Sequence, residues 1–167
     1  MRKLIYKDLE DGKTKKLMLC KEKGGVYLFG YYCLQDTSAN WDHFFSTIED
    51  ANECCLEEYN INVEDWIIIS DQPKHCQQDF IIPTMIKGRD IEKPEFGHSQ
   101  SFIDGKWIDY ISSDECMSFD GLTSNERLYV SGLISEFEIA VVNDKVNAVK
   151  ILKALNFDKA SIDKIIG

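Results

Sequence analysis

Hydrophobic and polar residues alternate with a period of two over the first third of the chain, which predicts a β-meander. The pattern places strands at residues 3–9, 15–20 and 26–34. The turns between them are Asp11-Gly12 and Gly24-Gly25, dipeptides that tolerate positive φ. The third strand is apolar on both faces and is expected inside the sheet, whereas the lysines of the first two strands predict sheet edges.

A helix is predicted directly after this meander. Residues 35–45 form a turn-rich connection ending in aromatic side chains, and Ser46-Thr47-Ile48-Glu49 then has the form of a capping box. Asn60 is a plausible end of the helix. The buried stripe predicted from helical spacing consists of Ile48, Ala51, Cys55, Leu56 and Tyr59.

The middle of the chain returns to strands and loops. Residues 66–70 and 80–87 read as strands on either side of a polar loop, 71–79. Residues 88–100 read as an irregular connection, and 101–111 as a hairpin that turns at Asp104-Gly105.

The last 45 or so residues change to the helical period of 3.6. Thr123-Ser124-Asn125-Glu126 is a second capping box, and the helix after it is expected to bury one stripe. That stripe consists of Val130, Leu133, Ile134, Phe137 and Val141. Asn143-Asp144 breaks the pattern before a shorter helix, and Asp158 begins a terminal turn.

These elements predict an α+β fold: an antiparallel β-meander sheet packed on a central helix, with a C-terminal helical hairpin. We divide the chain into a sheet domain, residues 1–98, and a second part, residues 99–167, that contains the β-hairpin and the helical hairpin. The helical hairpin is too small to be stable alone, so the two parts are expected to dock as one compact unit.

The net charge of −10 is concentrated in one segment. Residues 1–30 carry eight basic and four acidic side chains, whereas residues 31–80 carry one basic and eleven acidic side chains. A negative field repels nucleic acid and anionic lipid and attracts basic proteins. Alternatively, the acidity serves only solubility.

The N-terminus lacks the apolar segment of a secretory signal, and nowhere do about 18 apolar residues follow one another, as a membrane span requires. We therefore expect a cytoplasmic protein whose six cysteines are reduced thiols. The cysteines stand at positions 20, 33, 54, 55, 76 and 116. We expect no cofactor.

Two segments carry a resemblance. The first, WDHFFSTIEDANECCLEEYNINVEDWIIISDQPKHCQQDFIIP, and the second, ERLYVSGLISEFEIAVVNDKVNAVKILKAL, resemble parts of uncharacterised small bacterial proteins. By its size, acidity and α+β composition the chain is also similar to the immunity proteins of bacterial toxin systems. The resemblance implies a bacterial cytoplasmic origin and supplies no mechanism.

The leading functional hypothesis is a non-catalytic interaction protein, with the immunity type as the candidate class, that presents an acidic face to a basic protein partner. Like charges four residues apart on one helix destabilise it, so an acidic stripe without local compensation is typical of a binding face. Solvent screening or the N-terminal lysines would equally relieve the repulsion. The candidate partner-binding residues are Glu49, Glu53, Glu57, Glu58, Trp41 and Asp42.

The alternative is a small hydrolase or metal-dependent enzyme that uses His75, Cys76 and Asp79 of the 71–79 loop. These residue types ligate zinc or form a Cys/His nucleophile. The loop lacks the Cys-x-x-Cys and His-x-x-x-His spacings of such sites, however, and the preferred interpretation is a polar turn whose Asp side chains accept from backbone N–H groups.

Overall fold

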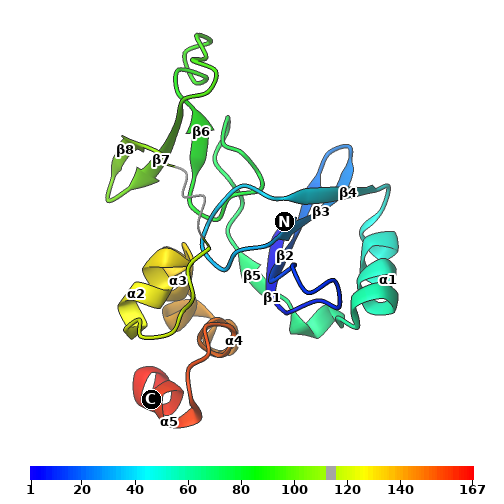
Figure 1. Ribbon diagram of the computed structural model, residues 1–167, viewed down its shortest axis with the longest axis vertical. Coiled ribbons are helices and arrows are strands. Elements are labelled where there is room, and N and C mark those ends of the chain that lie inside the picture. The colour runs from blue at the N-terminus through cyan, green and yellow to red at the C-terminus, as the bar shows by residue number, and fades with distance from the viewer. Residues whose placement is uncertain (112–115) are drawn as a thin grey trace.

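A five-stranded antiparallel sheet in the order β4-β3-β2-β1-β5 forms the centre of the computed structural model (Figure 1), which describes residues 1–111 and 116–167. Its strands are β1 (Arg2–Tyr6), β2 (Lys16–Glu22), β3 (Gly25–Tyr31), β4 (Trp41–Phe45) and β5 (Ile67–Ile69). The predicted α+β class and the meander are confirmed. The first connection is longer than the predicted two-residue turn at Asp11-Gly12, because the backbone N–H of Leu9 donates to the Thr14 carbonyl and residues 10–13 form the loop. The second turn lies at Lys23-Gly24 and not at Gly24-Gly25, since Glu22 pairs with Gly25.

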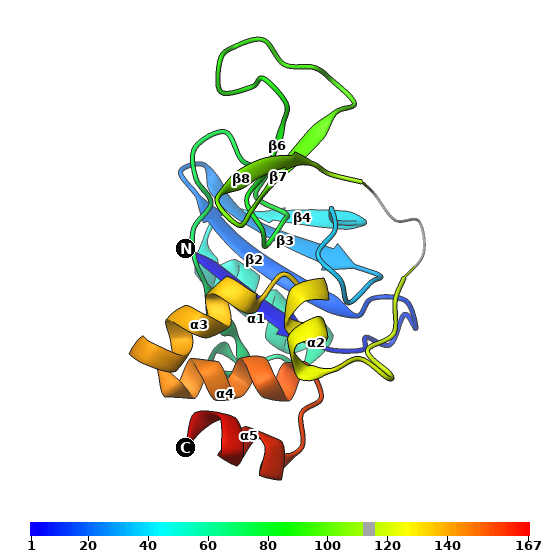
Figure 2. The same ribbon diagram turned by 90° about the vertical axis from the view of Figure 1, so that its left-hand side faces the viewer.

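Helices cover both faces of this sheet. Helix α1 (Ile48–Tyr59) lies on one face, and the short 3-10 helix η1 (Val63–Asp65) follows it. The C-terminal helices lie together on the opposite side (Figures 1 and 2), and they are α2 (Ser124–Val130), α3 (Ile134–Asn143), α4 (Lys145–Ala154) and α5 (Lys159–Ile166).

A second, three-stranded sheet stands apart from the first (Figure 1). It consists of β6 (Thr84–Ile86), β7 (Ser99–Ile103) and β8 (Lys106–Asp109). Asp104 and Gly105 both have positive φ, 50° and 78°, and so form the predicted turn between β7 and β8. Because β6 pairs with β7, this sheet spans the boundary that we placed at residue 98.

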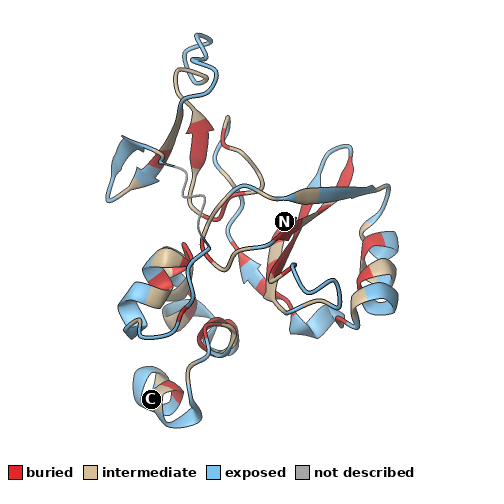
Figure 3. Ribbon diagram, in the orientation of Figure 1, coloured by how far each residue is buried: buried red, intermediate tan, exposed pale blue. Residues whose placement is uncertain are grey.

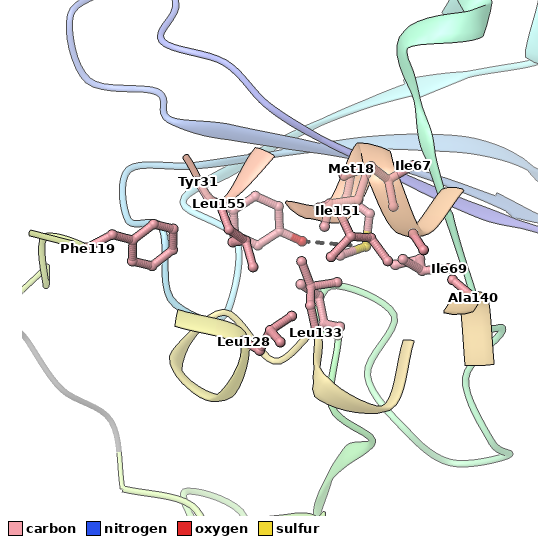
Figure 4. Close-up of a cluster of buried hydrophobic side chains, with 13 residues drawn as sticks. Met18, Tyr31, Ile67, Ile69, Phe119, Leu128, Leu133, Ala140, Ile151 and Leu155 are labelled. Atoms are coloured by element: carbon pink, nitrogen blue, oxygen red, sulfur yellow. Dashed lines mark hydrogen bonds between the residues drawn. The ribbon is translucent and has the colours of Figure 1, made fainter. Parts of the chain in front are cut away.

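The period-two pattern of the central sheet divides its side chains between two cores. The core under α1 consists of Leu17, Leu19, Val26, Leu28, Ala51, Cys55, Ile61 and Trp66. The core on the other face (Figure 4) consists of Leu4, Met18, Tyr31, Ile67, Ile69, Ile81, Phe119, Leu128, Leu133, Ala140, Ala148, Ile151 and Leu155. The C-terminal helices thus dock on the sheet.

The prediction that β1 and β2 are edge strands is wrong, because β2 is the middle strand of the five. Lys16 is fully buried there, and among residues 1–111 and 116–167 its ammonium group forms no ion pair. Its Nζ donates to the Gln35 carbonyl at 2.9 Å and lies 4.3 Å from the centre of the Tyr31 ring. A lysine in a strand is therefore no proof of an edge.

The true edge strand β5 is covered by side chains of the C-terminal helices. Asn147 of α4 accepts from the backbone N–H of Ile68 at 2.9 Å and donates to its carbonyl at 2.8 Å, as a neighbouring strand would. The carboxylate of Glu136 accepts from the backbone N–H of Ser70. These bonds close the edge against further strand pairing.

Asp36 joins three parts of the chain next to the second core. Its carboxylate accepts from the backbone N–H groups of Ile81, at 2.8 Å, and Ile82, at 2.7 Å. Its own backbone N–H donates to the carbonyl of Val130 at 3.0 Å. Burial raises the pKa of Asp36, and the nearby Lys16 partly offsets this effect.

Several local predictions need correction. Residues 41–45 form strand β4 and not a turn-rich connection, since their aromatic side chains pack across β3. The helix expected after Thr123 is broken into α2 and α3 at Gly132, whose φ is 77°. Leu56, assigned to the buried stripe of α1, is 48% exposed.

The capping residues of the helices follow the sequence closely. Thr123 and Glu126 form the predicted capping box of α2, and Asn60 ends α1 in the left-handed conformation. The N-cap of α1 is Thr47, one residue after the predicted Ser46.

The expectation of six reduced thiols is wrong for two cysteines. Cys33 and Cys116 form a disulfide with a Cα–Cα distance of 5.1 Å and a sequence separation of 83 residues. Cys20, Cys54, Cys55 and Cys76 are free.

Replacing Lys16 with methionine tests its burial. Burial lowers the pKa of Lys16 from 10.5 to about 8. Between these values the unfolded chain binds more protons than the folded protein, so the lysine destabilises the fold less as the pH rises. The free energy of unfolding of the wild type minus that of Lys16→Met is expected to increase by about 2 kcal/mol between about pH 7.5 and 10, measured by urea denaturation. For the control Lys13→Met, at an exposed turn, the free energy of unfolding of the wild type minus that of the variant should not change with pH. A pH-independent value for Lys16→Met would contradict the burial of Lys16.

Gly132→Ala tests the contact with Asp36. A Cβ at Gly132 would lie 2.9 Å from the Cβ of Asp36, whereas Gly121, with nearly the same φ of 78°, has open space around it. Gly121→Ala is expected to lower the free energy of unfolding by about 1 kcal/mol from backbone strain alone. Gly132→Ala should lower it by about 3 kcal/mol, since overlap adds to the strain. Equal effects of the two substitutions in urea denaturation would show that Asp36 moves aside at no cost.

Candidate functional site

A cleft of about 600 Å³ lies where the β1–β2 connection, strand β4 and the C-terminal end of α1 meet. Residues 7–11 line it on one side, and residues 57–60 of α1 line it on the other. Trp41 and His43 of β4 complete the lining. Three segments that are distant in the sequence therefore build this site.

The aromatic part of the cleft is held by Trp41. Its indole ring lies over Gly30 of β3, where a Cβ would come within 2.0 Å of it, so the position requires glycine. Its ring centre is 5.0 Å from that of His43 and 6.5 Å from that of Tyr59. The ring is half-buried.

Hydrogen bonds connect this indole to the rim of the cleft. Trp41 Nε1 donates to Thr14 Oγ1 at 3.2 Å, and Thr14 Oγ1 donates to the carboxylate of Asp11 at 2.6 Å. Asp11 also accepts from the backbone N–H groups of Lys13 and Thr14. The bonds from Thr14 and Lys13 lower the pKa of Asp11, which keeps this carboxylate charged.

Five carboxylates line the cleft; Asp8 pairs with Lys15 at 2.9 Å, and the lysine of the cleft, Lys7, binds backbone carbonyls. The acids are Asp8, Glu10, Asp11, Glu57 and Glu58. The Nζ of Lys7 donates to the carbonyls of Tyr59 at 2.7 Å and Asn60 at 2.8 Å, so its charge lies at the C-terminal end of α1. Burial, together with Glu58, raises the pKa of Tyr59 to about 12, which keeps the phenol neutral.

The acidic face of α1 continues from the cleft. Glu49, Glu53, Glu57 and Glu58 are all exposed, and the outward side of the helix is exposed as a whole (Figure 3). Within residues 1–111 and 116–167, none of these carboxylates forms an ion pair. The N-terminal lysines therefore do not pair with the stripe, although Lys7 reaches the end of the same helix.

The structure divides the predicted partner-binding residues. Trp41, Glu57 and Glu58 line the cleft, and Glu49 and Glu53 lie on the outer face of α1. Asp42 alternates with Trp41 along β4 and therefore points to the opposite face of the sheet, where it is paired with Phe29. Asp42 is thus separate from the cleft.

The 71–79 loop places its three candidate residues in structural roles. The Cys76 thiol is buried, and burial raises its pKa, which disfavours the thiolate. The Asp79 carboxylate accepts from the backbone N–H of Ala39 at 3.0 Å. His75 adopts a positive φ of 73° in the turn. Nowhere in the described chain do three or more His, Cys, Asp or Glu side chains form a group that could hold a metal ion.

Sequence reasoning missed the β1–β2 side of the site. Asp11 was recognised only as a turn residue, and Thr14 and Tyr59 were not considered as partners of Trp41. The available signal was the acidic run Asp8-Leu9-Glu10-Asp11 in an otherwise basic segment.

No family model matches the chain, and no curated protein or solved structure is significantly similar to it. Across the described residues, the helices are too short or too polar to cross a bilayer.

Gly30→Ala tests how Trp41 is held. The added Cβ occupies the place of the indole ring, so Trp41 must leave its position in the cleft. The free energy of unfolding is expected to fall by about 2–3 kcal/mol in urea denaturation, with a changed near-ultraviolet circular dichroism. Gly24→Ala, where an added Cβ meets nothing within 4 Å, is the control and should change neither. An unchanged Gly30→Ala spectrum would show that the indole is not fixed there.

Proposed function

We propose that this protein is a non-catalytic interaction protein that binds a basic protein partner through the cleft and the adjoining outer face of α1. The observation that carries the proposal is the combination of an aromatic floor, Trp41, with carboxylates that lack ion pairs, Glu57 and Glu58, in one cleft. Such a site suits an arginine or lysine side chain, which gains both a salt bridge and a cation–π contact.

The outer glutamates have a different role in the proposal. Glu49 and Glu53 are fully accessible to solvent-borne partners, and charges at the rim of an interface mainly accelerate association. The desolvated contacts of the cleft supply affinity, since central aromatic anchors dominate binding energy. Binding is therefore expected to weaken with ionic strength.

The resemblance to immunity proteins extends the proposal to the kind of partner. An acidic α+β protein of this size suits a bacterial cytoplasmic role in which it covers a basic surface of a toxin. The support consists of charge, size and fold class, because no relative with a known partner was found. A basic toxin encoded next to this protein is the partner to test first.

The double variant Glu53→Lys/Glu57→Lys tests the proposed face. Both side chains are exposed, so the fold should persist, and circular dichroism checks this. The affinity for a basic protein partner, measured by isothermal titration calorimetry, is expected to fall at least about tenfold.

A charge-matched control separates the site from the general field. Asp90→Lys/Glu92→Lys changes the net charge equally in an exposed loop away from the cleft. This variant should lose no more than about threefold in affinity, the effect of long-range charge alone. Equal losses of affinity in the two double variants would show that the attraction is non-specific. Unchanged affinity in Glu53→Lys/Glu57→Lys would refute the proposed binding face.

A further inference from the structure

The Cys33–Cys116 disulfide differs from the remaining cysteines in its accessibility. Cys116 is exposed and Cys33 is half-buried. Of the free cysteines, Cys20, Cys55 and Cys76 are buried and Cys54 is half-buried. Burial raises the pKa of all four free thiols, and carboxylates add to the effect at Cys20 and Cys54. In the described chain, the disulfide is therefore more accessible to a redox reagent than any free cysteine, and the free cysteines are mostly protonated.

The disulfide connects two segments that organise the fold. Cys33 lies two residues after the end of β3, two residues before Gln35 and three before Asp36. Cys116 precedes the segment that leads from the small sheet into α2. The backbone N–H of Met117 donates to Gln35 Oε1 at 3.1 Å, so a hydrogen bond and a covalent bond attach the same two segments side by side.

Beyond the disulfide and Met117, the described part of this segment is anchored in the core by Phe119 and Leu122. Phe119 is buried, with its ring centre 6.4 Å from that of Tyr6, and the backbone N–H of Leu122 donates to the Phe119 carbonyl. Residues 116 to 118 are exposed. The disulfide closes a loop of 83 residues, and such a cross-link strongly restricts the opening of the segments that it joins.

We propose that Cys33–Cys116 is a thiol–disulfide exchange site for dithiol reductants, and that its reduction releases the segment 116–122 from the end of β3. Solvent-exposed disulfides are typical of labile and regulatory bonds. The proposal is independent of the acidic cleft, which lies at β4 and α1.

The exchange proceeds in two balanced steps. A thiolate of the dithiol attacks the exposed Sγ of Cys116, the S–S bond breaks, and Cys33 leaves as a thiolate that takes a proton from water. The second thiol of the reagent then attacks the mixed disulfide and releases Cys116, which is protonated in turn. The protein gains two electrons and two protons, and the dithiol becomes a disulfide.

The first measurement establishes the bond. Purified protein is denatured without reductant, alkylated with iodoacetamide and weighed by mass spectrometry, and four of the six cysteines should react. After treatment of the native protein with dithiothreitol, six should react. Six alkylated cysteines without reductant, or resistance of the native disulfide to dithiothreitol, each overturns the proposal.

The second measurement tests the release. Hydrogen exchange of the oxidised and the dithiothreitol-reduced protein is compared by mass spectrometry, with α1, residues 48–59, as an internal reference. Exchange across 116–122 should accelerate at least about tenfold on reduction while α1 stays constant. Cys116→Ser in oxidising buffer should reproduce the reduced pattern, and Cys54→Ser should not. Equal exchange of residues 116–122 in the oxidised and reduced protein would contradict the proposed release. This comparison uses the wild-type protein, so the test holds even if Cys116→Ser fails to fold.

Discussion

The half-buried aspartate Asp36 connects three parts of this molecule through hydrogen bonds and so sets their relative positions. It accepts from the backbone N–H groups that lead into β6, and its own N–H donates to the end of α2. Separating these segments would break all three hydrogen bonds of Asp36, so the aspartate favours their present arrangement. Gly132 follows from the same constraint, because a side chain there would occupy the space of Asp36.

The two faces of the central sheet are covered in different ways. The face under α1 is closed by that helix over a hydrophobic cluster with the buried Thr14 at its margin, which leaves the outer side of α1 free. The other face also buries Arg2 and Lys16, whose nitrogens donate to loop carbonyls such as those of Ser70 and Gln35. These hydrogen bonds hold the loops against the sheet, so that loops and C-terminal helices together cover this face.

Local chemistry could be predicted from the sequence, and distant pairing could not. The turn at Asp104-Gly105 and the caps at Asn60 and Thr123 depend on neighbouring residues alone, and all three are confirmed. Strand β4 was missed because aromatic residues after a polar run suit a loop until β3 is beside them. The Cys33–Cys116 pairing lies 83 residues apart, and cysteine spacing alone does not determine connectivity.

The same limit explains the candidate site. The acidic stripe of α1 is visible in the sequence, but a stripe alone does not distinguish a solvated helix from an interface. What the sequence hides is that Lys7 reaches the carbonyls at the end of α1, where the helix dipole is unfavourable for Glu57 and Glu58. The lysine stabilises the helix end while leaving the carboxylates without an ion pair. Acidic residues are thereby tolerated beside Trp41, where a cationic side chain of a partner would gain both a salt bridge and a cation–π contact.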